Sequence, residues 1–168
     1  MGNEERNTYV KKQITNAFIE LLKQNEFSNI SISDITNEAQ VSRNSFYRNY
    51  IEKEDILLNY IHSLLQEWRI LDNREENQTN EKMYGSLFAH LKANSDFYIL
   101  LKNKNLFHLF LKEFLAIFGS KPDQDNLSAY IVSFIAYGTY GWIEEWIARG
   151  MQESAESMTT LLSSQGQT

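Results

Sequence analysis

Cysteine is absent from the 168 residues of the sequence, which also contains one proline and seven glycines. Without cysteine the sequence offers no disulfide framework, no thiolate nucleophile and no cysteine-ligated metal site. Because proline and glycine are the residues that most often interrupt helices, their scarcity favours mostly helical structure. Hydrophobic residues make up 42% of the chain and aromatic residues 13%, so an all-α fold with a sizeable core is expected.

Long apolar segments are also missing. The most apolar stretch, residues 106–118, contains His108, Lys112 and Glu113, whereas a membrane span needs about 20 predominantly apolar residues. The first residues lack the basic and then apolar pattern of a signal peptide. The sequence therefore predicts a cytoplasmic protein without a membrane partner.

Positive charge is in short supply, since 16 Lys and Arg stand against 22 Asp and Glu and the net charge is -6. Such a balance argues against a protein that coats nucleic acid through bulk electrostatics. It leaves room for a local basic edge, so DNA binding has to be judged from the placement of individual residues.

The usual catalytic motifs are absent from the sequence as well. There is no Glu-x-x-His or His-x-x-x-His pair, no glycine-rich phosphate loop and no Gly-x-Ser-x-Gly. His62, His90 and His108 are expected to be surface or core histidines, and Glu144 and Glu145 a solvated pair. The sequence predicts no enzymatic activity, no metal site and no cofactor.

Three helices, one long and two short, are expected in the first 50 residues. Apolar residues recur at helical spacing over residues 9–23. A serine cap, Ser31 or Ser33, precedes a short second helix, and Ser42 precedes a third helix that buries Phe46. This order is that of a helix-turn-helix, whose last helix enters the major groove of DNA. On spacing alone, an ordinary helical hairpin with a solvated charged face is an equal alternative.

The exposed side of the expected third helix carries groups suited to DNA. Arg43 can donate a fork of hydrogen bonds to guanine or phosphate, and Asn44 can pair with adenine. Arg48 adds positive charge, and Lys53 begins the next helix, whose first amides also face outward to a phosphate. The predicted DNA-binding residues are Ser31, Ser33, Ser42, Arg43, Asn44, Ser45, Tyr47, Arg48 and Lys53.

Three segments of this region resemble the TetR family of bacterial repressors, and the resemblance covers about residues 8–60. They are residues 30–35 (Ile-Ser-Ile-Ser-Asp-Ile), residues 39–50, which contain Val-Ser-Arg and then Phe-Tyr-Arg, and residues 53–57 (Lys-Glu-Asp-Ile-Leu). The resemblance implies that Ser31, Tyr47 and Lys53 contact DNA phosphates. It also implies that Arg43, Asn44 and Ser45 make contacts in the groove.

Some positions depart from the family pattern. Gln40 stands where the family usually has glycine in the turn, and a positive φ there would cost about 1 kcal/mol. Asn44 replaces a frequent glycine and Asn49 a frequent histidine, which affects operator preference and the set of phosphate contacts. Tyr50 matches an aromatic residue that mainly packs in the core.

The resemblance also implies a helical-bundle body that dimerises through its last long helices and holds an inducer pocket. Polar residues 72–81 are the expected loop before this body. Further helices are expected over residues 82–93, 95–101, 105–118, 125–149 and 153–162. The predicted architecture is therefore all-α, with a three-helix DNA-binding head over residues 7–60 and a helical ligand-binding and dimerisation body over residues 61–168.

Two regions of the body are candidate sites. In the long helix, Gly138 and Gly141 allow close approach of another backbone, and Trp142 and Trp146 would flank it. This face is predicted to form the dimer interface, with packing inside one chain as the alternative. A group of aromatic residues is predicted to line a pocket for a small apolar or aromatic inducer, with a packed core as the alternative: Trp68, Tyr84, Phe88, Phe107, Phe110 and Trp142.

The function predicted from these patterns is a ligand-responsive repressor that acts as a homodimer on a palindromic operator of double-stranded DNA. The alternative is a helical adaptor that keeps the helix-turn-helix without specific DNA readout and engages another protein. Binding of the chain to DNA from its own upstream region separates the two.

Overall fold

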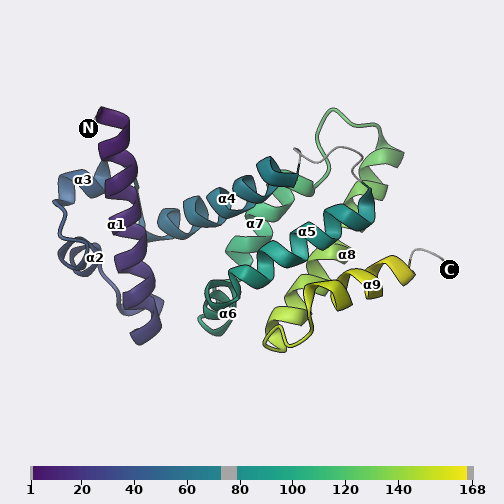
Figure 1. The fold of residues 1–168 in the computed structure, drawn as a ribbon. Coiled ribbons are helices and arrows are strands. Elements are labelled where there is room, and N and C mark those ends of the chain that lie inside the picture. The colour runs from purple at the N-terminus through teal and green to yellow at the C-terminus, as the bar shows by residue number, and fades with distance from the viewer. Residues whose placement is uncertain (1, 73–78, 166–168) are drawn as a thin grey trace. The chain divides into compact units, whose positions relative to one another are not determined.

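The computed structural model describes residues 2–72 and 79–165 and, within these ranges, contains helices and no strand. The chain divides into two compact units, Met1–Ile61 and His62–Thr168, named here the head and the body (Figure 1). Helix α4 (Lys53–Asp72) begins in the head and ends in the body. No described helix is long and apolar enough to cross a lipid bilayer.

The head is built from α1 (Asn3–Gln24), the 3-10 turn η1 (Phe27–Asn29), α2 (Ile32–Glu38), α3 (Arg43–Tyr47) and the first turns of α4. Each of the four helices contributes apolar side chains to one core. The fully buried apolar residues of the head are Ile14, Phe18, Leu22, Ile35, Phe46, Ile56, Leu57 and Ile61. The order of one long and two short helices is the one that the sequence predicts.

Two serines start the short helices, as the sequence predicts. The Ser31 hydroxyl accepts a hydrogen bond from the Asp34 amide in α2, and the Ser42 hydroxyl accepts one from the Ser45 amide in α3. Each bond satisfies a backbone N–H that has no partner within its helix. Between the two helices Gln40 has a φ of 53°. The turn therefore has the positive φ for which the family uses glycine, at a cost of about 1 kcal/mol.

The body adds these helices among the described residues: α5 (Asn80–Ala93), α6 (Ser95–Asn103), α7 (His108–Phe118), α8 (Asn126–Ala148) and α9 (Ala155–Gln165). Helix α9 packs along α5, and α8 packs against α6 and α7 (Figure 1). After α8 the chain turns through Gly150 and Met151, whose φ angles are 78° and 52°. The Met151 amide donates to the Trp146 carbonyl across this turn.

The helix bounds in the body differ from the sequence predictions by a few residues. Helix α7 begins at His108 rather than at Asn105, because Asn105 has a φ of 58° and interrupts the helical geometry. Helix α9 begins at Ala155 rather than at Glu153. The predicted loop over residues 72–81 lies mostly outside the described residues.

Candidate DNA-binding site

Helix α3 is anchored to the head by one buried residue and presents polar side chains outward. Phe46 is fully buried, and its ring lies 5.7 Å from the ring of Tyr50 and 5.5 Å from that of Tyr47. Tyr50 is 4% exposed, as expected for a core residue, and burial raises the pKa of its hydroxyl. The exposed side chains on and just after α3, which we call the recognition face, are Arg43, Asn44, Tyr47 and Arg48.

Arg43 is positioned by a contact across the turn. Its guanidinium donates a hydrogen bond to the Ser33 hydroxyl in α2, with Nη2 and Oγ 2.5 Å apart. A guanidinium has five N–H donors, so most of them remain for a guanine edge or a phosphate. The structure thus joins two of the predicted DNA-binding residues and ties the recognition face to α2.

Ser31 is less favourably placed for the phosphate contact that the resemblance implies. Its hydroxyl donates to the Asp34 carboxylate at 2.7 Å and accepts from the Asp34 amide at 3.2 Å. Hydrogen bonds from the Ser31 hydroxyl, and next from its amide, hold the pKa of Asp34 below its ordinary value. A phosphate beside Ser31 would therefore have to displace one of these bonds next to a negative charge, which argues for a weak contact at this residue.

Ser42 and Ser45 order the start of α3. Their hydroxyls share a hydrogen bond of 2.9 Å, and the Asn49 side-chain amide donates to the Ser45 carbonyl at 2.8 Å. Ser42 is exposed and Ser45 half-buried. Both hydroxyls already form hydrogen bonds at the start of α3. A direct DNA contact from either hydroxyl stays a prediction.

Lys53 has a structural role in addition to the predicted DNA contact. Its ammonium donates to the carbonyl oxygens of Phe27 and Ile30 at 2.5 and 2.8 Å, and it lies 4.3 Å from the centre of the Phe27 ring. These contacts combine charge-assisted hydrogen bonds with a cation–π interaction. A phosphate contact from Lys53 would compete with them. The sequence carried no signal for this role, because the acceptors lie 26 and 23 residues earlier.

The head as a whole is not basic, since its 61 residues include seven Lys and Arg and nine Asp and Glu. Some of the acidic groups are engaged locally: the Asp55 carboxylate accepts hydrogen bonds from the amides of Ile51 and Glu52. The prediction of DNA contacts therefore rests on the local placement of Arg43 and Arg48 in the recognition face.

Helix α8 leaves a row of large apolar side chains uncovered in the single chain. This row, the α8 outer face, consists of Leu127, Tyr130, Ile131, Phe134, Ile135 and Tyr137, each roughly half exposed or more. Phe134 is the most exposed of them, at 82%. Residues 126–143 contain no charged residue. Over about five turns, one side of this helix therefore offers only uncharged groups to solvent.

The residues predicted for the dimer interface divide between this surface and the core. Gly138 and Gly141 are exposed, and no described atom outside their own helix turns lies within 4 Å of an added Cβ. Trp142 is half-buried. The structure corrects the prediction for Trp146, which is 2% exposed and packs edge-on against Phe88 at 5.6 Å. Trp146 lies four residues after Trp142, so it is rotated about 40° further around the helix axis. This rotation is enough to direct the Trp146 ring into the core.

The six residues predicted to line a ligand pocket do not surround one cavity in the described structure. Four of them are buried in the core: Trp68, Phe88, Phe107 and Phe110. The rings of Phe107 and Phe110 stack with their centres 5.0 Å apart and leave no room between them. Trp142 lines a groove of about 310 Å³ between α8 and α9. Tyr84 is the predicted residue that lines another cavity, which is partly open to solvent.

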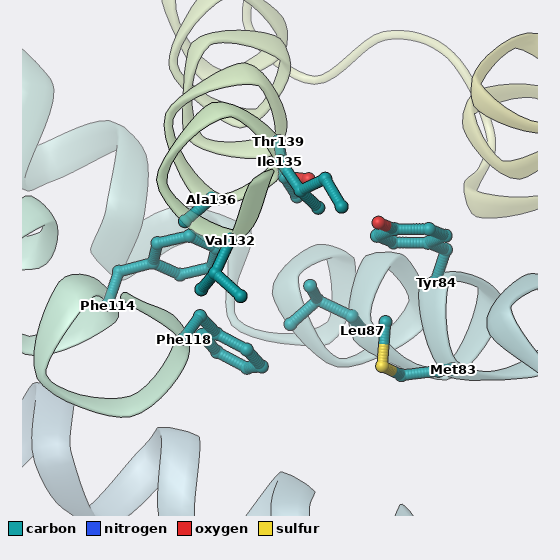
Figure 2. Close-up of a pocket in the computed structure, with 9 residues that line it drawn as sticks. All are labelled: Met83, Tyr84, Leu87, Phe114, Phe118, Val132, Ile135, Ala136 and Thr139. Carbon is teal, nitrogen blue, oxygen red and sulfur yellow. The ribbon is translucent and has the colours of Figure 1, made fainter. Parts of the chain in front are cut away.

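That cavity has a volume of about 120 Å³ and lies between α5, α7 and α8 (Figure 2). Its lining side chains are Met83, Tyr84 and Leu87 from α5, Phe114 and Phe118 from α7, and Val132, Ile135, Ala136 and Thr139 from α8. Of the six residues that the sequence predicts for a pocket, Tyr84 alone is among these nine, because the arrangement of aromatic residues in the sequence does not show which helices leave a space between them. The space depends instead on small and aliphatic residues such as Ala136 and Leu87.

Several ionisable side chains of the body pair with one another. The Lys102 ammonium and the Glu144 carboxylate are 2.7 Å apart, and the His62 imidazole and the Glu113 carboxylate are 2.9 Å apart. Burial, and next the Glu144 carboxylate, raise the pKa of Tyr140 to about 12. Among the described residues, no group of three or more His, Cys, Asp or Glu is placed to hold a metal ion.

The head holds two short helices, α2 and α3, joined by a tight turn, and α3 presents polar side chains outward. Together with the helical body, this arrangement defines a DNA-binding protein of the helix-turn-helix class. The family profile described as "Bacterial regulatory proteins, tetR family" matches residues 14–60. The profile described as "Transcriptional regulator C-terminal region" matches residues 78–165. The chain belongs to the TetR family of transcriptional regulators.

Individual relatives agree with this assignment. The chain is 33% identical over 112 residues to the HTH-type dhaKLM operon transcriptional activator DhaS of Lactococcus lactis subsp. lactis (strain IL1403). This match covers 65% of the chain and 58% of the relative, which is less than two thirds of the relative's length.

Two solved structures share the fold. One, named as the dihydroxyacetone kinase operon activator DhaS, has a TM-score of 0.59 and 23% identity and covers 92% of each chain. The other, a TetR transcriptional regulator from Streptococcus agalactiae 2603V, has a TM-score of 0.61 and 21% identity and covers 94% of this chain and 93% of that one. At these identities, the two structures support the fold alone.

Membership of the family confirms the predictions of an all-α fold, a helix-turn-helix, DNA binding and a regulatory rather than enzymatic role. The prediction of repression is not confirmed, since the relative with 33% identity is an activator.

Proposed function

We propose that the chain acts as a homodimer whose two recognition faces bind the half-sites of a palindromic DNA operator. The observation that carries the proposal is the α8 outer face. Monomeric proteins rarely leave a contiguous apolar surface of this kind in water. Its residues recur at short intervals along one helix, so a helix of a partner can cover them together.

A second copy of the chain is the partner that DNA binding requires. One short α3 reads too few base pairs for tight specific binding, so two heads should act on half-sites one helical turn, about 34 Å, or a multiple apart. In a two-fold dimer the same surface of each chain meets itself. The uncharged residues 126–143 bring no like charges together in such a contact. The groove between α8 and α9 adjoins this surface at Gly141 and offers space for a partner's large side chain.

Within each head, the exposed residues differ in their proposed roles. Arg43 and Asn44 contact base edges in the major groove, because their side chains match the donors and acceptors of guanine and adenine. Tyr47 and Arg48 contact phosphates, which position the head without reading sequence. Ser33 acts through Arg43, whose guanidinium it holds.

In this proposal, residues 7–60 bind DNA, and residues 61–168 form the dimer and sense a ligand. The protein acts in the cytoplasm. A ligand that prefers a dimer whose heads do not fit adjacent major grooves lowers operator affinity. A ligand that prefers a dimer whose heads do fit raises it. To move such an equilibrium from 1:99 to 99:1, the ligand must prefer one arrangement by about ten-thousandfold.

Repression is the sense of regulation that the sequence predicts, and activation is the second candidate. Activation is favoured by the name of the 33% identical relative, an activator of the dhaKLM operon. Deleting the gene and measuring transcripts of the neighbouring operon distinguishes the two. A rise in transcript supports repression, and a fall supports activation.

The dimer and its DNA binding are tested together on the full chain. Gel-shift with DNA from upstream of its gene should show a complex that random DNA of equal length does not compete away. Light scattering should give a mass near twice 19.7 kDa. A stable monomer at micromolar concentration would contradict the dimer. Equal binding to both DNAs would favour the alternative of a helical adaptor.

A further inference from the structure

The outward side of α8 carries large side chains in its first half and glycines in its second half. Leu127 and Tyr130 are each more than two thirds exposed. At Gly138 and Gly141, no described atom of another element lies within 4 Å of an added Cβ. Phe134, the most exposed residue of the α8 outer face, lies between the two halves. One end of this side therefore protrudes, and the other end is flat and open.

The spacing of these residues is symmetric about Phe134. Tyr130 lies four residues before it and Gly138 four residues after it. Leu127 lies seven residues before it and Gly141 seven residues after it. With 3.6 residues per turn, all four lie within about 40° of Phe134 around the helix axis. A second α8 turned end for end therefore offers a glycine at the level of each of these two large side chains.

We propose that the α8 helices of two chains pack antiparallel, with the two-fold axis of the dimer at Phe134. The inference rests on the proposed homodimer and adds the direction and the register of its contact. Leu127 lies at the level of Gly141 of the partner subunit. Tyr130 lies at the level of Gly138 of the partner subunit, and Phe134 meets its own copy on the axis. Each large side chain enters the space that a glycine leaves, as ridges enter grooves between packed helices.

A parallel pairing of the same helices would not match in size. It would set Tyr130 against its own copy at one end and Gly141 against its own copy at the other. Overpacking at the first end and empty space at the second both weaken a contact. The antiparallel pairing instead repeats the same combination of large residue and glycine on both sides of the axis, as two-fold symmetry requires.

The open groove between α8 and α9 extends this fit. Its lining includes Gly141 and Trp142 from α8 and Met158 from α9, and its volume is about 310 Å³. In the antiparallel pairing, Leu127 of the partner subunit lies level with Gly141 and next to Trp142, at the edge of the groove. Burial of this leucine against the Trp142 ring removes apolar surface of both chains from water. The groove is therefore completed by a side chain that one chain cannot supply to itself.

Cysteine cross-linking of the full chain tests direction and register, because the sequence contains no cysteine of its own. Facing positions of packed helices are close enough for a disulfide, whose Cα atoms lie about 4–7 Å apart. Under mild oxidation, Phe134→Cys should form a disulfide-linked dimer, and so should the double variant Leu127→Cys/Gly141→Cys. Each of the latter two substitutions alone should not, since equivalent residues lie about 21 Å apart along the paired helices. Ala116→Cys, at an exposed position of α7, is the control and should give no linked dimer.

An exchange of sizes tests the pairing of Leu127 with Gly141 independently of oxidation. Gly141→Leu should weaken the dimer by about five- to 150-fold. Adding Leu127→Ala removes the side chain that the new leucine meets and should recover part of this loss. Adding Ile135→Ala instead truncates a side chain of the same face that is not level with Gly141, and it should weaken the dimer further. Sedimentation measures the dissociation constants, and circular dichroism checks that helicity is kept.

Three results would overturn the proposed register. They are a linked dimer of Leu127→Cys or Gly141→Cys alone, a dimeric mass without cross-links in Phe134→Cys and in the double cysteine variant, and no recovery by Leu127→Ala. A monomeric mass of the unmodified chain would overturn the homodimer as well. Failure of the register is therefore distinguishable from failure of the dimer.

Discussion

The head and the body differ in how completely a single chain covers its own apolar residues. In the head, the large exposed apolar residues Tyr9, Tyr47 and Ile51 come from separate segments. In the body, such residues follow one another along the α8 outer face. One chain therefore completes the head, whereas the body calls for a further contact. In the proposed homodimer, each chain carries its own DNA-recognition residues, and operator binding depends on assembly.

Phe134→Glu is expected to have the largest effect, on both the dimer and operator affinity. It brings two negative charges together across a two-fold contact, so the dimer should dissociate to 19.7 kDa. Operator affinity should fall on the order of a hundredfold or more, because the two heads no longer bind as a linked pair. Sedimentation and gel-shift measure the two effects. Ile51→Glu is the control, since Ile51 is 86% exposed but lies in the head, and it should keep the dimer mass. A Phe134→Glu protein that stays dimeric would contradict the proposed contact.

Gly141→Leu probes the same contact by size instead of charge. In the single chain an added Cβ at Gly141 has no atom of another element within 4 Å, and leucine favours the helix over glycine, so helicity should be kept. Across a dimer contact it should overpack by about 1–3 kcal/mol, which corresponds to a dimer weaker by about five- to 150-fold. Circular dichroism and sedimentation read the two effects. If both stay unchanged, the dimer contact has to be sought on α9.

Arg43→Ala tests the head by base preference. The substitution should relax the preference at one operator position by about 1–3 kcal/mol, as measured by competition between operators with single-base changes. Arg48→Ala serves for comparison and should weaken operator and random DNA about equally. An unchanged ranking of the operator variants after Arg43→Ala would rule out direct readout by this residue.

Lys53→Ala should act on stability as well as on DNA binding. It removes the hydrogen bonds to the carbonyls of Phe27 and Ile30, which should lower the free energy of unfolding by about 1–3 kcal/mol. The slope of log affinity against log salt should flatten by about one unit if the ammonium also contacts a phosphate. Lys23→Ala, which breaks an exposed pair with Glu20, should cost much less. Equal stability of the two variants would show that Lys53 does not hold the head together.

Asp34 should give the smallest effect, seen as a dependence of head stability on pH. Its pKa lies below the ordinary value of 3.8, chiefly because the Ser31 hydroxyl donates to the carboxylate. Since the folded pKa is the lower one, the stabilisation is present above about pH 4 and is lost as the pH falls through the folded pKa. Urea unfolding at about pH 7 and about pH 2.5 should show the wild type converging on Asp34→Asn in acid. A constant difference between the two proteins would refute this contribution.

The head could be predicted more fully than the body because its signals are local. Ser31 and Ser42 cap amides three residues away, and the turn at Gln40 follows from a short motif. The contact of Lys53 with Phe27 could not be predicted, since it depends on how distant segments meet. In the body, periodicity predicts the helices and their order. It does not distinguish Trp142 from Trp146, because both positions fit the same amphipathic pattern and neighbouring helices decide which ring is covered.

If the α8 outer face forms the proposed dimer, operator occupancy also depends on the amount of protein in the cell. If the operator binds only the paired form, then below the dimer dissociation constant the amount of that form grows with the square of the chain concentration. A doubling of expression then raises operator occupancy about fourfold while occupancy is low. The cellular level of the protein thereby becomes an input to transcription in its own right, alongside any effector.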